Sequence, residues 1–332
     1  MRRKSSLMIL LAVFMIFAFV VTGCSNGTPQ EEPNQEGTAS DFPSKPVTLI
    51  VPYGAGGGTD VTARLLAEPL EKALGQPVVV QNIEGGGGWN GWGQLANAPK
   101  DGYTLGYVNI PNVFAGYLDP AMNRKENIDS FIMLLNHVTD PGIFAVKADS
   151  KYNSMQDVID DAKANPGKVS ITAHGVGGDD YLGIKQIEKT TGVEFNIIHN
   201  NSTAESKTQV LGGHVDVLGA NVSEITGMVA NGEIKVLGVA YDKRSEFLPD
   251  VPTLQEQGID AVHFAARGMA VPAGTPDEIV EKLTSALEEA IANPDYLSKY
   301  EELGLSLEPK KGQEYTDFIK TWESKIKELM GW

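Results

Sequence analysis

Residues 47–82 read VTLIVPYGAGGGTDVTARLLAEPLEKALGQPVVVQN, and residues 169–200 read VSITAHGVGGDDYLGIKQIEKTTGVEFNIIHN. Each stretch has a strand-like apolar run, a glycine-rich loop, a helical segment and a second apolar run that ends in Asn. Gly75 or Gly192 follows the helical segment, as is usual where a helix stops. Two such units in one chain predict two similar α/β lobes.

The rest of the chain continues to alternate short apolar runs with amphipathic segments. We expect strands at residues 47–52, 78–81, 104–108, 143–147, 169–173, 195–199, 215–218, 235–240 and 268–271. We expect helices at residues 59–74, 154–164, 179–191, 204–212, 275–293, 294–303 and 312–330. This order predicts an α/β fold with largely parallel sheets. The helices after residue 275 have no matching strands, so we expect them to pack on the first lobe.

Composition excludes several classes of protein. The chain has 332 residues, of which 42% are hydrophobic and 21% charged, so it is too apolar to be disordered. The length suggests about two domains. A net charge of −16 argues against nucleic-acid binding, which needs a cationic surface. A single Cys excludes a disulfide framework and a Cys-rich zinc site. Past residue 23, no apolar stretch is long enough to span a bilayer.

The first residues look like an export signal. Arg2, Arg3 and Lys4 precede an apolar run over residues 7–21, and Val-Thr-Gly-Cys follows. This layout predicts a signal peptide at residues 1–23. It resembles the lipobox of bacterial lipoproteins, in which the Cys, here Cys24, receives a diacylglyceryl group. The alternatives are an uncleaved anchor helix or an ordinary buried Cys. Residues 24–42 would then be the lipidated Cys and a flexible polar tether.

The two glycine-rich loops are the candidate binding site. Glycines let backbone N–H groups approach a ligand, and the following helix N-terminus adds unpaired donors and partial positive charge. The alternative is a pair of tight turns without a ligand. A dinucleotide site is disfavoured, because Thr59 stands where G-x-G-x-x-G ends in Gly, and the second strand ends in Gln81-Asn82 rather than an acidic residue. A side chain at Gly57 or Gly177 is expected to crowd the amides and block a ligand.

Catalytic and metal motifs are not recognisable. The sequence contains no G-x-S-x-G and no H-E-x-x-H, and Cys24 is its only Cys. The five His residues have no metal-ligand spacing, and we expect them to be structural or surface residues. No cofactor and no metal are expected. The pair Asp179-Asp180 at a helix start indicates either capping and dipole complementarity, or contact with a ligand ammonium group or a cation.

With its loops and several short motifs, the sequence resembles the substrate-binding proteins of tripartite tricarboxylate transporters, also called Bug-type receptors. The matching pieces span nearly the whole chain after the tether and include KPVTLIVPYGAGGGTDVTARLLAEPLEKALGQPVVVQN, KDGYTL, LGGHVDV, NGEIKVLGVA, LPDVPTLQEQG and VPAGTP. The resemblance implies a type II periplasmic-binding-protein fold, with two lobes around a ligand cleft and hinge crossings. It also implies that loop amides hold a small organic acid, often with waters. The residues carried over are Tyr53, Gly54, Gly56, Gly57, Gly58, Thr59, Asp60, Gly175, Val176, Gly177, Gly178, Asp179 and Asp180.

The sequence departs from the family pattern in places that bear on the ligand. WNGWGQ follows Gly85–Gly88 where smaller residues are usual, so Trp89 and Trp92 are either core or cleft wall. HNNSTAESK replaces a usual P-Y-x-G-G-like stretch, and Tyr181 stands where the family often has His. Arg267 lies where a returning hinge strand should pass the cleft. It is expected either to pair with a ligand carboxylate or to form an ordinary surface salt bridge.

We therefore expect a lipid-anchored, extracytoplasmic receptor that is not an enzyme. Its lobe 1 would comprise residues 43–141 and 243–332, and its lobe 2 residues 142–242. It would act as a monomer that closes around a small di- or tricarboxylate and passes it to membrane permease subunits. The alternative is an exported α/β enzyme or sensor domain that acts on carboxylates.

Overall fold

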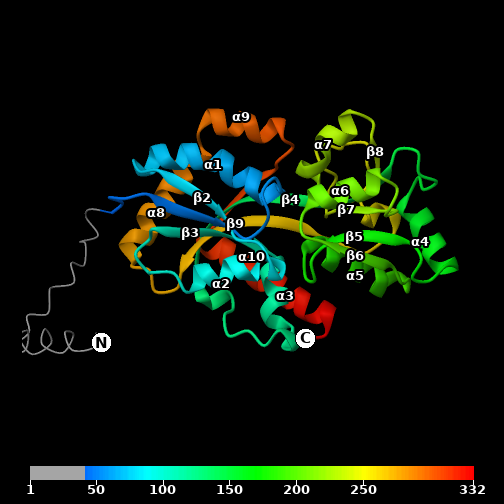
Figure 1. Ribbon diagram of the computed structural model, residues 1–332, viewed down its shortest axis with the longest axis horizontal. Coiled ribbons are helices and arrows are strands. Elements are labelled where there is room, and N and C mark those ends of the chain that lie inside the picture. Colours follow the sequence, from blue (N-terminus) through cyan, green and yellow to red (C-terminus); the bar gives the residue numbers. More distant parts are fainter. Residues whose placement is uncertain (1–41) are drawn as a thin grey trace, which may run out of the picture. The chain divides into compact units, whose positions relative to one another are not determined.

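The computed structural model describes residues 42–332, which fold into alternating strands and helices (Figure 1). The predicted signal peptide, Cys24 and nearly all of the tether lie outside the described residues. Within residues 42–332, none of the helices has the length and apolarity needed to cross a membrane. The α/β class expected from the sequence is confirmed.

Both repeated units form as predicted, with a strand, a helix and a second strand in each. The first consists of β1 (Val47–Val51), α1 (Gly58–Leu74) and β2 (Val78–Asn82). The second consists of β5 (Ser170–His174), α5 (Asp179–Thr191) and β6 (Asn196–Asn200). In each unit the two strands are parallel neighbours. Gly75 and Gly192 end the two helices with φ values of 67° and 73°, the left-handed conformation that favours Gly.

The largest sheet is mixed, so the expectation of largely parallel sheets is wrong. Its strand order is β10-β4-β9-β3-β1-β2, where the new members are β3 (Thr104–Ile110), β4 (Phe131–Lys147), β9 (Phe264–Pro272) and β10 (Leu307–Lys311). β1 is parallel to β2 and β3, whereas β9 is antiparallel to both β3 and β4. A helix connects the two parallel strands inside each repeat. β4 and β9 lie outside the repeats, and both pair with their neighbours in the antiparallel direction.

β4 connects two groups of elements. Its earlier residues pair with β9 and β10, and its later residues pair with β7 (Leu218–Asn221) and β8 (Ile234–Ala240). Only residues 143–147 of this strand were expected. Figure 1 shows β4 and β9 running between the group that contains β1–β3 and the group that contains β5–β8. The proposed lobe boundaries at residues 141/142 and 242/243 stay a prediction.

Eight further helices lie around these sheets in residues 42–332. They are α2 (Trp89–Ala96), α3 (Asn112–Leu118), α4 (Met155–Ala164), α6 (Thr203–Leu211), α7 (Val222–Ala230), α8 (Asp277–Ile291), α9 (Pro294–Glu302) and α10 (Gly312–Met330). Short 3₁₀ turns lie at Gly86–Gly88, Pro120–Met122, Ile128–Ser130 and Gln255–Gln257. The sequence patterns missed α2, α3 and α7.

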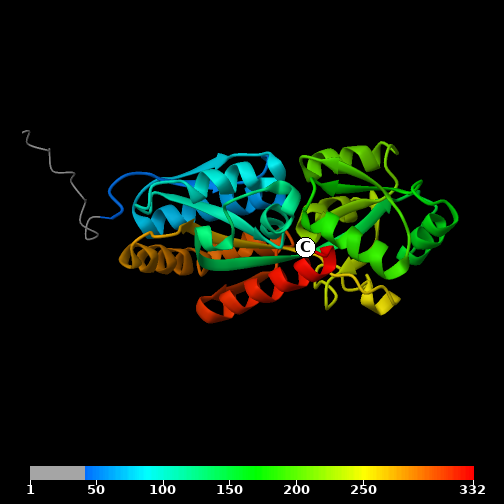
Figure 2. The same ribbon diagram turned by 90° about the horizontal axis from the view of Figure 1, so that it is seen from below.

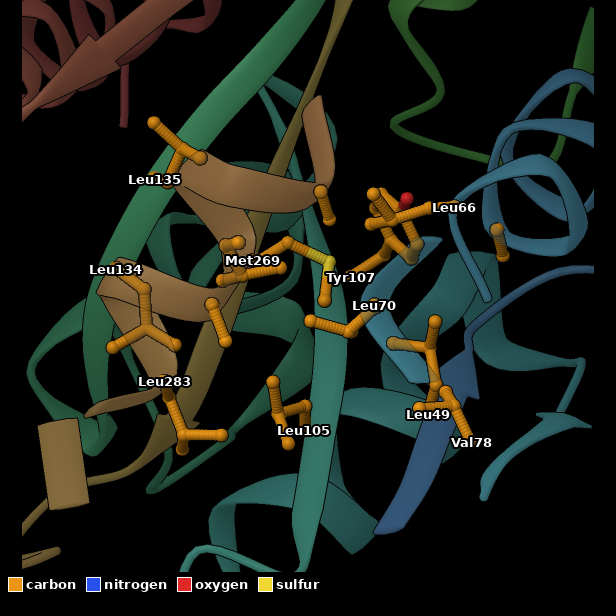
Figure 3. Close-up of a cluster of buried hydrophobic side chains, with 14 of the residues drawn as sticks. Leu49, Leu66, Leu70, Val78, Leu105, Tyr107, Leu134, Leu135, Met269 and Leu283 are labelled. Carbon is orange, nitrogen blue, oxygen red and sulfur yellow. The ribbon is translucent and has the colours of Figure 1, made fainter. Parts of the chain in front are cut away.

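The C-terminal helices pack on the first group of elements, as expected. Leu283 of α8 shares a buried core with Leu66 and Leu70 of α1 and Met269 of β9 (Figure 3). α10 packs on another face (Figure 2). Its Tyr315 joins a buried cluster that contains the α2 tryptophans. Burying one Leu side chain stabilises a fold by about 2 kcal/mol. These helices therefore form part of the scaffold that holds β1, β3 and β9.

Candidate functional site

The first glycine loop joins β1 to α1, and Asp60 holds its shape. Gly56 has a φ of 81°, and its N–H donates to Asp60 Oδ2 at 2.8 Å. The same carboxylate accepts from Arg64 Nε at 3.0 Å and from Asn82 Nδ2 at 2.9 Å. Burial alone would raise the pKa of Asp60, but these three hydrogen bonds outweigh it and lower the pKa. The Asp60 carboxylate is therefore engaged in hydrogen bonds that hold the loop.

Gly58, the first residue of α1, has a carboxylate bound to its N–H. The acceptor is Oε1 of Glu224, at 3.1 Å. A helix N-terminus favours a negative charge at this position. A Cβ added to Gly58 would lie only 2.3 Å from Nη2 of Arg267. Gly58 thus permits the close approach of Glu224 and Arg267 to the loop.

Glu224 reaches Gly58 from the first turn of α7. Its Oε2 accepts from the backbone N–H of Asn221 at 3.0 Å, and the two residues form a capping box. Its Oε1 also accepts from Thr203 Oγ1 at 2.6 Å. One side chain therefore connects the first glycine loop to α6 and α7.

Asp179 begins α5 after the second glycine loop and is buried. Its carboxylate accepts from Asn112 Nδ2 and Asn221 Nδ2, both at 3.0 Å, and lies 3.4 Å from His263 Nδ1. Burial would raise the pKa of Asp179, but His263 and the two amides outweigh it and lower the pKa. Because Asn112 belongs to α3, Asp179 also joins segments far apart in the chain.

Asp180 forms an ion pair with His174, the last residue of β5. Its Oδ2 lies 3.0 Å from His174 Nδ1, and its carboxylate also accepts from the backbone N–H groups of His174 and Tyr181. Burial alone would lower the pKa of His174, but Asp180 and then Glu224 outweigh it and raise the pKa to about 10. His174 therefore carries a positive charge at neutral pH.

Arg267 is a buried residue of β9, so the surface salt bridge considered for it is wrong. Its Nη2 lies 2.6 Å from Asp140 Oδ2 of β4, and its Nη1 donates to Thr62 Oγ1 at 3.1 Å. Asp140 also accepts from Ser223 of α7. Burial alone would lower the pKa of Arg267, but Asp140 outweighs it and raises the pKa. The pair ties together the two strands that run between the lobes.

Gly58, His174, Asp179, Glu224 and Arg267 line one pocket, whose cavity volume of about 50 Å³ is several times what one water needs. Of the predicted site residues, its wall contains Tyr53, Gly54, Gly57, Gly58, Thr59, Asp179 and Arg267. The predicted residues that do not line it are Gly56, Asp60, Gly175, Val176, Gly177, Gly178 and Asp180. Gly175 instead borders a neighbouring groove of about 310 Å³, which shares Tyr53 and His174 with the pocket.

Sequence reasoning missed more than half of the pocket wall. The missed residues are Asn109, Asn112, His174, Asn201, Ser202, Thr203, Asn221, Glu224 and Ala265. Several follow or end strands, and a polar residue at a strand's carboxyl end is a signal that could have found Asn109 and Asn221. Trp89 and Trp92 do not line the pocket. Both are buried in the core, and Trp92 Nε1 donates to the backbone oxygen of Tyr107.

The backbone angles of the loops and the metal-ligating side chains both bear on what the protein can bind. Gly57 has a φ of −79°, which any residue can adopt, whereas Gly56, Gly175 and Gly177 have φ values of 81°, 56° and 94°, which favour glycine. Within residues 42–332, His, Cys, Asp and Glu side chains nowhere converge in a group of three that could hold a metal ion.

Comparison with known proteins gives matches over most of the chain. A family model described as "Tripartite tricarboxylate transporter family receptor" matches residues 62–331. A UPF0065 protein in the gbd 5′ region of Cupriavidus necator is 33% identical over 296 residues, which cover 88% of either chain. The periplasmic binding protein BugD is 29% identical with a TM-score of 0.80, over 87% of this chain and 98% of BugD. An R. palustris protein solved with adipate is 26% identical with a TM-score of 0.78, over 88% of this chain and 99% of that protein.

Proposed function

We propose that this chain, which belongs to the tripartite tricarboxylate transporter family of receptors, captures a small organic acid in the pocket and delivers it to a membrane permease. The family and its structural relatives are solute-binding receptors, and the fold is the two-lobed α/β fold of periplasmic binding proteins. No chemical step is part of the proposal.

The observation that carries this proposal is the carboxylate on the N–H of Gly58. The N–H of Gly58, at the start of α1, donates a hydrogen bond to the Glu224 carboxylate, which supports this helix start as a place for a ligand carboxylate. Arg267 and the charged His174 lie on the same wall. A ligand carboxylate would bind beside these groups, with Glu224 moving aside or sharing their donors. The adipate in the R. palustris relative supports an acid as the ligand class.

Capture would proceed by closure of the two lobes. The wall combines residues of the first repeat, such as Thr59, with residues of the second, such as Asp179. Such a pocket assembles only when both groups of elements approach each other, and β4 and β9 are the strands that run between them. Closure would replace water around the acid by fixed donors of the loops.

The test is mass spectrometry of ligands released from protein purified without refolding, followed by calorimetry with succinate, glutarate and adipate. Stoichiometric binding of a carboxylate without turnover is the expected result. Turnover of the bound acid would favour the alternative, an exported α/β enzyme. A protein that binds none of these acids and none of their amino-substituted forms would contradict the proposal.

We also propose that Cys24 anchors the protein outside the cytoplasm. The basis is the basic start, the apolar run and the Val-Thr-Gly-Cys sequence. Cys24→Ser should release the protein from membranes and leave its Tm within about 1 °C, because the packed core of residues 42–332 is unchanged. Fractionation after an alkaline wash is the measurement. Equal membrane retention of variant and wild type would rule out the lipid anchor.

A further inference from the structure

The pocket contains more negative charge than a receptor for a simple dianion needs. Four carboxylates lie on or next to its wall: Asp140, Asp179, Asp180 and Glu224. Arg267 is paired with Asp140, and His174 with Asp180. Among residues 42–332, Asp179 and Glu224 have no Lys or Arg at ion-pair distance, and the nearest basic group to Asp179 is the His263 ring.

Asn221 brings these two carboxylates to one side of the pocket. Its side-chain Nδ2 donates to Asp179, and its backbone N–H donates to Glu224, each at 3.0 Å. A carboxylate can accept about four hydrogen bonds. Glu224 accepts three from the described residues, so it keeps a free acceptor position.

Two residues of the same pocket wall, Asn109 and Asn112, have buried amide oxygens without partners among the described residues. Asn112 donates its Nδ2 to Asp179, which fixes the orientation of the amide, because an ionised carboxylate can only accept. Its Oδ1 then has no hydrogen-bond partner among the described residues, although only 5% of the residue is exposed. Asn109 donates to Thr59 and likewise leaves its Oδ1 unpartnered, at 1% exposure. Leaving a buried acceptor unpaired costs about 1–3 kcal/mol.

Unpaired acceptors beside carboxylates that have no Lys or Arg at ion-pair distance favour a ligand group that donates hydrogen bonds and carries positive charge. A metal ion fits less well, because no group of three metal-ligating side chains converges in the described part of the chain. A protonated amine supplies three donors and one positive charge on a small group.

We propose that the pocket takes an amino acid-like ligand, in which a carboxylate is joined to a protonated amino group held by Asp179, Glu224 and the amide oxygens of Asn109 and Asn112. The proposal rests on the proposed function, since the carboxylate end would use the donors near Gly58, Arg267 and His174. Beyond the proposed function, this inference adds a positively charged amino group to the ligand and names the residues that would select for that group.

Three matched pairs of acids test the proposal by calorimetry on the purified protein: succinate with L-aspartate, glutarate with L-glutamate, and adipate with L-2-aminoadipate. The members of a pair differ only in the α-amino group. We expect at least one amino acid to bind tenfold or more tightly than its partner. If the plain acids bind as well as their amino partners, the amino subsite is wrong and the receptor for organic acids stands. If none of the six binds, both proposals fail.

Glu224→Gln then tests the residue, because it keeps the shape of the side chain and removes its charge. The preference for the amino acid within the best pair should shrink at least fivefold, with succinate-type acids weakened less or even tightened. Glu281→Gln is the matched control, since Glu281 is an exposed residue of α8 away from the pocket. A preference that is unchanged in Glu224→Gln would remove Glu224 from the subsite. If Glu224→Gln unfolds, L-malate on the wild type serves instead, because its neutral hydroxyl should restore less than a tenth of the gain of the amine.

Discussion

Gly57 and Gly58 are neighbours in one loop, yet a side chain on each would meet different surroundings. A Cβ on Gly57 would have only the backbone oxygen of Gly54 nearby, at 3.6 Å. A Cβ on Gly58 would lie 2.3 Å from Arg267 and 3.1 Å from Glu224 Oε1. The need for glycine is therefore steric at Gly58, where the loop meets the pocket, and it does not arise from the backbone angle of Gly57.

Gly58→Ala should weaken ligand binding at least tenfold, because the methyl group displaces Arg267 or Glu224 from the pocket. Gly93→Ala is the control, because Gly93 lies in α2 outside the pocket wall and has no atom within 4 Å of an added Cβ, so this variant should bind within about twofold of wild type. Calorimetry with the tightest-binding acid of the six is the measurement. Equal affinities of the two variants would show that the start of α1 is only a turn.

His174 allows a prediction about pH. Its pKa in the folded protein is about 10, whereas an unperturbed His has a pKa of about 6.5. A raised folded pKa gives stability that is fully present below pH of about 6.5 and is lost as the pH rises through about 10. His174→Gln should therefore lower the unfolding free energy at pH 7 by about 3 kcal/mol, since it removes the charged partner of the buried Asp180 carboxylate. At pH 10.5 the difference from wild type should be clearly smaller.

Urea unfolding at both pH values measures this difference. His214→Gln is the control, because His214 is exposed and should change stability by less than about 0.5 kcal/mol at either pH. If wild type and His174→Gln differ by the same amount at both pH values, the ion pair with Asp180 does not stabilise the fold.

At the scale of elements, local patterns predicted the two repeats well. Gly75 and Gly192 adopt the left-handed conformation that ends a helix, so the sequence around each of them is enough to predict where the helix ends. The first part of β4 could not be recognised in the same way. It contains buried Asn136 and Asp140 and then Pro141, whose residue type is rare inside strands, and its pairing with β9 depends on residues more than a hundred positions later.

The same limit applies to the pocket. The glycine loops were identified because they are local and repeated, and seven of the predicted residues lie on the pocket wall. Glu224 was missed because its contact with Gly58 spans 166 positions of the chain. The capping box of Asn221 and Glu224 could predict the start of α7, but no local pattern indicates which other segment a capping carboxylate also contacts.

The contact between the second loop and α3 gives a prediction at this scale. Gly177 has a φ of 94°, and a Cβ there would lie 2.3 Å from the Cβ of Ala115. Gly177→Ala should therefore hinder closure and weaken ligand binding at least fivefold, in addition to backbone strain of about 1 kcal/mol. Gly192→Ala is the matched control. It has a φ of 73° but no atom near the added Cβ, so it should lower Tm similarly and leave affinity unchanged.

Calorimetry and thermal unfolding of both variants separate the two effects. A Gly177→Ala variant that binds like wild type would mean that the loop does not need to approach α3 when the ligand is bound.

At the scale of the whole molecule, the net charge repels an anionic ligand at long range, whereas the donors of the pocket attract it at short range. The chain carries a net charge of −16, so an anionic acid is repelled by the surface as a whole. Gly58, His174 and Arg267 line the pocket where we propose that its carboxylate binds. The two effects differ in range, and salt can separate them.

Salt screens exposed charges within about 30 Å at 0.01 M and about 8 Å at 0.15 M, but it screens buried pairs much less. Raising the salt concentration between these values should therefore remove most of the long-range repulsion and leave the contacts in the pocket intact. We expect the dissociation constant of the tightest-binding acid to fall by about twofold. Calorimetry in potassium chloride and in potassium fluoride controls for competition by one particular anion. Binding that weakens severalfold in both salts would mean that an exposed cationic surface attracts the ligand, and the buried pocket would then not be its principal site.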